Sequence, residues 1–144
     1  MITVKQVLEN KQGDVLTVAP EEDLYHALKI MADNNIGALV VVENGKAVGV
    51  FSERDFARNA VRKENLSKHM VVGQLMSICV HYVRPKQTID ECMSMMTEYR
   101  TRHLPVLDRG KLVGIISIGD VLKHTIAEKE FKIQNLENYI SGGL

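Results

Sequence analysis

The chain has 144 residues, of which 45 % are apolar and 25 % charged, an ordinary composition for a globular protein. Lys plus Arg equals Asp plus Glu at 18 each, so the chain has no general attraction for nucleic acid or an anionic membrane, and its charge does not oppose self-association. It has no long apolar run and no charged-then-apolar leader, so we expect no transmembrane helix, no signal peptide and a cytoplasmic location.

The first predicted elements are a short helical turn at 4–8 and an extended segment that ends at Pro20. The segment is expected to be extended because a proline disfavours helical geometry in the residue before it. An amphipathic helix follows, since its apolar residues recur at the i, i+3, i+4, i+7 spacing of one helix face. These residues are Leu24, Ala27, Leu28 and Met31.

A β-hairpin and a second helix complete this unit. The apolar run 38–42 is rich in β-branched residues and predicts a buried strand. Asn44-Gly45 is a strong two-residue hairpin signal, so the return strand is 47–51. Ser52 is a good N-cap for the helix after it. The unit is therefore βαββα.

The same unit occurs again 65 residues later, for example with Asp55 matched by Asp120. The second copy is predicted to contain a helical turn at 72–76, an extended segment at 82–85, helix residues Ile89, Cys92, Met93 and Met96, strands 104–107 and 112–116, and an N-cap at Ser117. Pro105 cannot donate to a sheet, so its strand should start there or lie at an edge. One copy alone has too small a core, so we expect the two to pack face to face.

The repeat divides the chain into a first copy at 1–65, a second copy at 66–125 and a tail at 126–144. The stretch 62–71, which is rich in charged residues, is the predicted linker. In the tail, apolar residues spaced by three, four and seven predict an amphipathic helix, which should pack on the body or on a second chain. They are Ile126, Ile133, Leu136 and Ile140.

Both copies contain a Gly-x-x-Ser-x-x-Asp element where a strand turns into a helix, at 49–55 and 114–120. A helix N-terminus offers free backbone N–H groups to a phosphate, and the Asp can accept hydrogen bonds from two ribose hydroxyls. The alternative is that Ser and Asp only cap the helix. The presence of the element in both copies favours the nucleotide interpretation.

The Val-x-Pro segment, amphipathic helix, apolar strand, Gly-Lys turn and Ser-x-x-Asp element together resemble the CBS domain, named after cystathionine beta-synthase. Two copies resemble a CBS pair, or Bateman module, over 1–125, most closely at 102–106 and 114–120. The whole chain is similar to small stand-alone bacterial two-CBS proteins. The resemblance implies an α/β fold of two βαββα repeats with pseudo-two-fold symmetry, plus a C-terminal helix.

In that family, adenosine ligands such as AMP, ADP, ATP and NAD lie in two clefts between the paired sheets. The resemblance therefore implies that Asp55 and Asp120 bind ribose hydroxyls and that Ser52 and Ser117 meet phosphate. It also implies that strand starts hold adenine and that the segments before the prolines form a further wall. These residues are Ile36, Gly37, Ala38, Thr101, Arg102, His103 and the neighbouring Pro105, with Thr17, Tyr82 and Val83 in the wall.

Phosphates need cations, and Arg54, Arg58 and Arg62 share one helix face at a spacing of four. The alternative for this row is a solvated face with Glu partners. The resemblance places Arg102 and His103 near the second cleft.

We expect the cleft of Ser117 and Asp120, beside Arg102 and His103, to be the better nucleotide site. Its helix start carries Gly119, which leaves room for a close backbone approach.

These features predict a regulatory module that senses an adenine nucleotide and signals to a partner protein. The alternative is a non-catalytic structural or interaction dimer with no native nucleotide. The sequence has no nucleophile–base pair, Walker loop or metal-ligand spacing, so we expect no catalysis, catalytic cofactor or metal. Family modules pair into disc-like dimers, so we expect a homodimer, with neither nucleic acid nor membrane as a partner.

Overall fold

The computed structural model describes residues 1–11, 13–62, 69–78 and 81–142. Most of the predicted linker 62–71, and the boundary between 65 and 66, lie outside the described residues. The helices and strands are α1 (Val4–Asn10), β1 (Thr17–Val18), α2 (Leu24–Asn34), β2 (Ala38–Glu43), β3 (Lys46–Ser52), α3 (Glu53–Arg62), the 3-10 turn η1 (Val72–Gln74), β4 (Ser77–Ile78), α4 (Ile89–Tyr99), β5 (His103–Asp108), β6 (Lys111–Ser117) and α5 (Ile118–Gly142).

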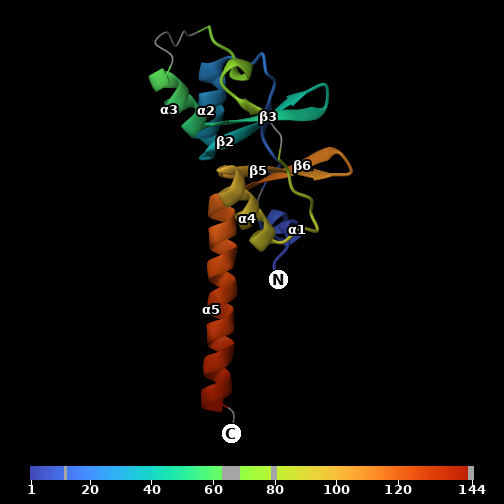
Figure 1. Cartoon of the computed structure of the whole chain (residues 1–144), viewed down its shortest axis with the longest axis vertical. Coiled ribbons are helices and arrows are strands. Elements are labelled where there is room, and N and C mark those ends of the chain that lie inside the picture. Colours follow the sequence, from blue (N-terminus) through green and yellow to red (C-terminus); the bar gives the residue numbers. More distant parts are fainter. Residues whose placement is uncertain (12, 63–68, 79–80, 143–144) are drawn as a thin grey trace.

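The two repeats each build a β-layer, and the layers lie one above the other with helices along their sides (Figure 1). The first layer is a sheet of order β1-β2-β3-β4, in which β1 is parallel to β2 and the remaining pairs are antiparallel. The second is the antiparallel pair β5-β6, which Val83 joins through a single parallel bridge to Val106. These elements confirm the predicted fold class of two βαββα copies.

Both hairpins turn as the sequence predicts. Asn44 and Gly45 have φ of 51° and 77°, and Arg109 and Gly110 have φ of 53° and 81°. Two successive positive φ values characterise the turn whose twist matches that of the flanking strands. The second turn shows that an arginine can take the left-handed position when a glycine follows it.

Two alternatives were predicted for Pro105, a strand start or an edge strand, and the second is confirmed. The strand β5 begins two residues earlier, at His103, and lies at the edge of the two-stranded β5-β6 sheet. The carbonyl of Pro105 accepts from the Val83 N–H at 3.0 Å. The nitrogen of Pro105 faces the same side of β5 as its carbonyl, where the described chain forms only the short Val83 bridge. The missing donor therefore costs the β5–β6 ladder nothing.

The helical turn before each repeat packs into the core of the other repeat. Val4 and Val7 of α1 belong to the apolar cluster that contains Leu104 of the second repeat. In the same way, Val72 of η1 belongs to the cluster that contains Phe51 of the first repeat. The two cores are thus completed by exchange, which ties the repeats together more closely than their sequence boundaries suggest.

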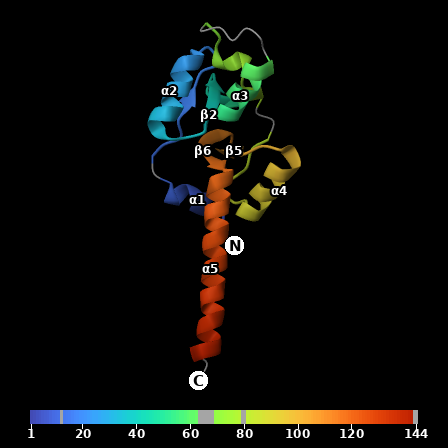
Figure 2. The ribbon, with the colours of Figure 1, turned by 90° about the vertical axis from the view of Figure 1, so that its left-hand side faces the viewer.

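The second helix of repeat two and the predicted tail helix form one continuous helix of 25 residues, α5. Its first turns pack on the body, where Val121 is buried, and the rest projects away from it (Figures 1 and 2). No helix in the described ranges is both long and apolar enough to cross a membrane.

Candidate functional site

The first Ser-x-x-Asp element forms a reciprocal cap at the start of α3. The Asp55 N–H donates to Ser52 Oγ at 3.1 Å, while Asp55 Oδ2 accepts from the Ser52 N–H at 3.1 Å and from Ser52 Oγ at 2.9 Å. The second carboxylate oxygen, Oδ1, accepts from Ser77 Oγ at 3.1 Å. The helix-capping role considered from the sequence is therefore present, and Asp55 also ties α3 to β4.

The second element forms the same cap at the start of α5, but adds a lysine from α1's C-terminal end. Asp120 Oδ2 accepts from the Ser117 N–H at 2.8 Å, and Ser117 Oγ accepts from the Asp120 N–H at 3.1 Å. Lys11 Nζ lies 2.8 Å from the same Asp120 oxygen and donates to the Ile115 carbonyl at 2.9 Å. Burial raises the pKa of Asp120, but the hydrogen bonds from Lys11 and Ser117 outweigh it and lower the pKa overall.

Two clefts lie between the repeats, and each is built from both copies. The first, the Lys11 cleft, has a volume of about 400 Å³. It joins the strand start of repeat one to the β6 end of repeat two. It is lined by Leu8, Lys11, Gly13, Asp14, Val15, Leu16, Asn34, Ile36, Gly37, Ala38, His103, Val113, Gly114, Ile115 and Ser117.

The second, the arginine cleft, has a volume of about 230 Å³ and reverses this pairing. It joins the strand start of repeat two to the β3 end and the first turns of α3 in repeat one. It is lined by Val50, Ser52, Arg54, Asp55, Arg58, Ser77, Ile78, His81, Tyr99, Arg100, Thr101, Arg102, His103, Leu104 and Pro105.

The crossed pairing corrects the expectation that Arg102 lies beside Ser117 and Asp120. Arg102 lines the arginine cleft with Ser52 and Asp55, and His103 lines both clefts. The backbone carbonyl of Arg102 does accept from Ile118 at the start of α5, but its side chain serves the other cleft. A strand start therefore faces the Ser-x-x-Asp element of the opposite copy.

Three expected wall residues line neither cleft. Thr17 is exposed on β1, Val83 is fully buried in the second core, and Tyr82 lines a separate cavity with Lys5. The walls come instead from the residues just before these segments, which the sequence interpretation missed.

The missed wall residues obey the same 65-residue shift as the rest of the repeat. Gly13–Leu16 line the Lys11 cleft, and Ile78 and His81, which correspond to Gly13 and Leu16, line the arginine cleft. His81 also stacks on Tyr99, with ring centroids 3.5 Å apart and planes at 8°. Applying the shift upstream of the Val-x-Pro segment would have found these positions.

Positive charge is concentrated in the arginine cleft. The neighbouring guanidiniums of Arg102 and Arg58 lower the pKa of Arg54, which shows their mutual repulsion. Within the described residues, no ion pair joins these three to a carboxylate. In the other copy, the positions equivalent to Arg54 and Arg102 are Gly119 and Gly37. The duplication has therefore produced one cationic cleft and one that lacks such a cluster.

His103 lies between the two clefts. Burial is the main cause that lowers its pKa, and the positive charge of Lys11 acts in the same direction, against Asp120 and Asp55. The neutral imidazole is therefore favoured more strongly at His103 than in an exposed histidine. Nowhere in the described part of the chain do three His, Cys, Asp or Glu side chains come together as a metal site.

Replacing Lys11 with methionine should lower the free energy of unfolding by about 1–2 kcal/mol at pH 7, because it leaves a largely buried carboxylate without its cation. The folded-state pKa of Asp120 lies below its ordinary value of 3.8, so the ionised pair stabilises the fold above about pH 4 and less as the pH falls further. Urea denaturation at pH 7 and pH 3 should show the deficit narrowing in acid. Lys5→Met, on the same helix, is the control, and an equal loss in both variants would contradict the assignment.

Comparisons with known proteins agree with this architecture. The family model described as CBS domain matches residues 4–62 and 72–126. A mitochondrial CBS domain-containing protein from Arabidopsis thaliana, CBSX3, is 33% identical over 98% of this chain and 73% of its own length. A solved CBS-domain protein from Burkholderia ambifaria is 48% identical with a TM-score of 0.82, over 87% of this chain and 94% of that one. CBSX2, solved in complex with AMP, is 26% identical with a TM-score of 0.72, over 90% and 99%.

Proposed function

Because this chain belongs to the CBS-domain family and carries the domain twice, we propose that it is a regulatory module that binds an adenine nucleotide and catalyses nothing. One observation carries the proposal: three arginines that form no ion pair among the described residues converge on the helix start that holds Ser52 and Asp55. They are Arg54, Arg58 and Arg102. Such a cluster, held together against its own repulsion, suits an anionic ligand. The AMP bound to the relative CBSX2 supports an adenine nucleotide.

The arginine cleft offers a distinct partner for each part of such a ligand. The guanidiniums of Arg54, Arg58 and Arg102 would take the phosphates, together with the N-terminus of α3. Asp55 would accept hydrogen bonds from the ribose hydroxyls, and these would replace the hydrogen bond that Ser77 now donates to it. We therefore propose that the phosphate-rich ligand binds in the arginine cleft and not in the Lys11 cleft, beside Ser117, which the sequence favoured.

Binding in this cleft would act on the arrangement of the repeats. The walls come from both copies, so a ligand that bridges them favours one relative placement over others. A partner protein could read that difference. The proposed ligands are cytoplasmic metabolites, and we propose a homodimer that acts in the cytoplasm.

The second candidate is a structural or interaction dimer with no native nucleotide. It is favoured by the complete caps of Ser52–Asp55 and Ser117–Asp120, which satisfy both elements without any ligand. Binding measurements separate the two candidates.

We expect ATP, ADP, AMP or NAD at about one hundred times its dissociation constant to raise the melting temperature by about 5–10 °C. Asp55→Asn should weaken the binding of that ligand by about tenfold or more, because the amide replaces one of the two acceptor oxygens with a donor and removes the charge that strengthens both bonds. Asp120→Asn is the matched control at the equivalent position of the second repeat, where Asp120 pairs with Lys11 outside the arginine cleft, and should change the affinity by less than about threefold. Calorimetric titration gives both values. If no adenine ligand, including S-adenosylmethionine, stabilises the chain, the structural dimer is the better assignment.

A further inference from the structure

The C-terminal part of α5 has no packing partner within its own chain. All residues from 129 to 142 are exposed, and they extend beyond the body along one straight helix (Figure 2). Helices of this length are marginal in water unless one face is covered. The helix is therefore built to meet another surface.

Its apolar residues follow a heptad repeat. Three isoleucines stand at successive a positions, and leucines occupy two of the three matching d positions, with Lys129 in the third. Isoleucine at a and leucine at d favour a parallel two-stranded coiled coil. The a positions are Ile126, Ile133 and Ile140, and the d positions are Leu122, Lys129 and Leu136.

This stripe is free of the body even where α5 touches it. Val121 faces the body and is 1% exposed, whereas Leu122 is 50% and Ile126 55% exposed. One residue is about 100° around a helix, so the stripe runs beside the packed face and not through it. At its upper end, Leu122 lines a cavity with Met93 of α4, whose exposed side chain extends the apolar surface onto the body.

The flanking charges select one partner and one orientation. In a parallel pair, Lys132 at g faces Glu137 at e of the second helix, which is an attraction between opposite charges. In an antiparallel pair, e positions face e and g positions face g, so Glu130 would face Glu130 and Lys132 would face Lys132 of the second helix. These repulsions are offset only in part by Lys123 opposite Glu137. Charge and apolar pattern therefore agree on a second copy of this chain, aligned in parallel.

We propose that α5 joins two copies of this chain as a parallel two-stranded coiled coil, from Leu122 to Ile140. The dimer axis then runs along α5, which places the second repeats of both copies side by side. Lys129, a charged residue in the seam, limits the strength of the pair. The inference rests on the proposed self-association and is independent of nucleotide binding.

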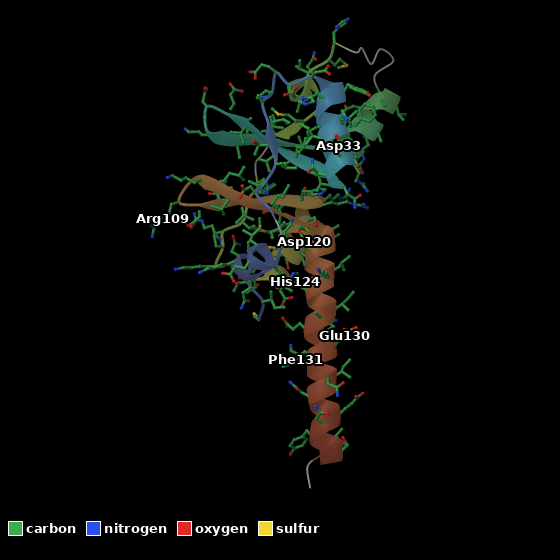
Figure 3. All side chains as sticks on the ribbon, turned by 180° about the vertical axis from the view of Figure 1, so that it is seen from behind. Asp33, Arg109, Asp120, His124, Glu130 and Phe131 are labelled. Atoms are coloured by element: carbon green, nitrogen blue, oxygen red, sulfur yellow. The ribbon has the colours of Figure 1, made fainter. Side chains whose placement is uncertain are left out.

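Two apolar residues on the projecting part of α5 give a matched test. Leu136 and Phe131 are 62% and 67% exposed in the single chain, but only Leu136 lies in the seam (Figure 3 marks Phe131). Sedimentation equilibrium of the full chain without nucleotide should show a dimer. Leu136→Glu should raise its dissociation constant at least tenfold, and Phe131→Glu should change it by less than about threefold. Lys129→Leu should tighten the dimer, which a merely disruptive effect of mutation would not do.

The orientation is tested by a cysteine at Ile140. In a parallel pair the two copies of this residue are adjacent, so oxidised Ile140→Cys should form a disulfide-linked dimer beyond the level of the wild-type chain with its own Cys79 and Cys92. Absence of that product would overturn the parallel arrangement. A dimer that survives Leu136→Glu would overturn the coiled coil while leaving self-association intact, and a monomeric wild-type chain would overturn both. Neither result bears on the nucleotide titrations.

Discussion

Arg102→Glu is expected to weaken ATP binding by about 100-fold or more, because it removes a charge-assisted contact and pairs the remaining arginines with an internal carboxylate. Arg102 lines the arginine cleft with Arg54 and Arg58, whose charges already oppose one another. A glutamate here would satisfy the cluster without any ligand. Adenosine, which carries no phosphate, should lose much less affinity. The measurement is a calorimetric titration of both ligands.

Arg109→Glu is the matched control for this substitution. Arg109 lies at the tip of the β5–β6 hairpin, away from α3 and α5 (Figure 3), and lines a different cavity. The change in net charge is the same, so a general electrostatic effect would weaken ATP binding equally in both variants. An equal loss of ATP affinity in the two variants would contradict a phosphate site in the arginine cleft. An equal loss of affinity for ATP and for adenosine in Arg102→Glu would contradict it too.

Gly49→Ala is expected to lower the free energy of unfolding by about 3 kcal/mol, at the upper end for inserting a methyl group into a packed site. A Cβ at this buried position would lie 2.7 Å from the Ser77 carbonyl oxygen and 2.7 Å from Met76 Sδ. The backbone of β4 cannot move aside without breaking its pairing with β3. Because Ser77 also donates a hydrogen bond to Asp55, the Gly49→Ala variant should bind its ligand in the arginine cleft more weakly as well.

Gly114→Ala is the internal comparison, since Gly114 is the equivalent residue in the second repeat. There the added Cβ would meet the side-chain end of Leu8, at 2.6 Å from Cδ2. A leucine can change rotamer at modest cost, so we expect a loss of about 1 kcal/mol. Urea denaturation of both variants gives the difference. A larger loss in Gly114→Ala would show that β4 does not hold Gly49 as closely as the structure indicates.

The sequence by itself determined the local structure. Helix faces, the hairpins at Asn44-Gly45 and Arg109-Gly110, and the caps at Ser52 and Ser117 all follow from short-range geometry, which residue spacing records. The repeat also predicted two clefts, one beside each Ser-x-x-Asp element. Even the heptads of α5 could be read, though the length of that helix was underestimated because the tail was separated from it.

The tertiary structure alone decided which parts meet. Lys11 bonds to Asp120, which lies 109 residues away in the sequence. Arg102 lines the arginine cleft, beside Ser52, and not the Lys11 cleft. Helical turns α1 and η1 complete the opposite cores. No residue spacing in the sequence records these contacts, because each joins segments whose separation in sequence says nothing about their distance in space. The resemblance between the copies therefore predicted part of the lining of each cleft, and only the packing of one copy on the other showed which half of each cleft comes from which repeat.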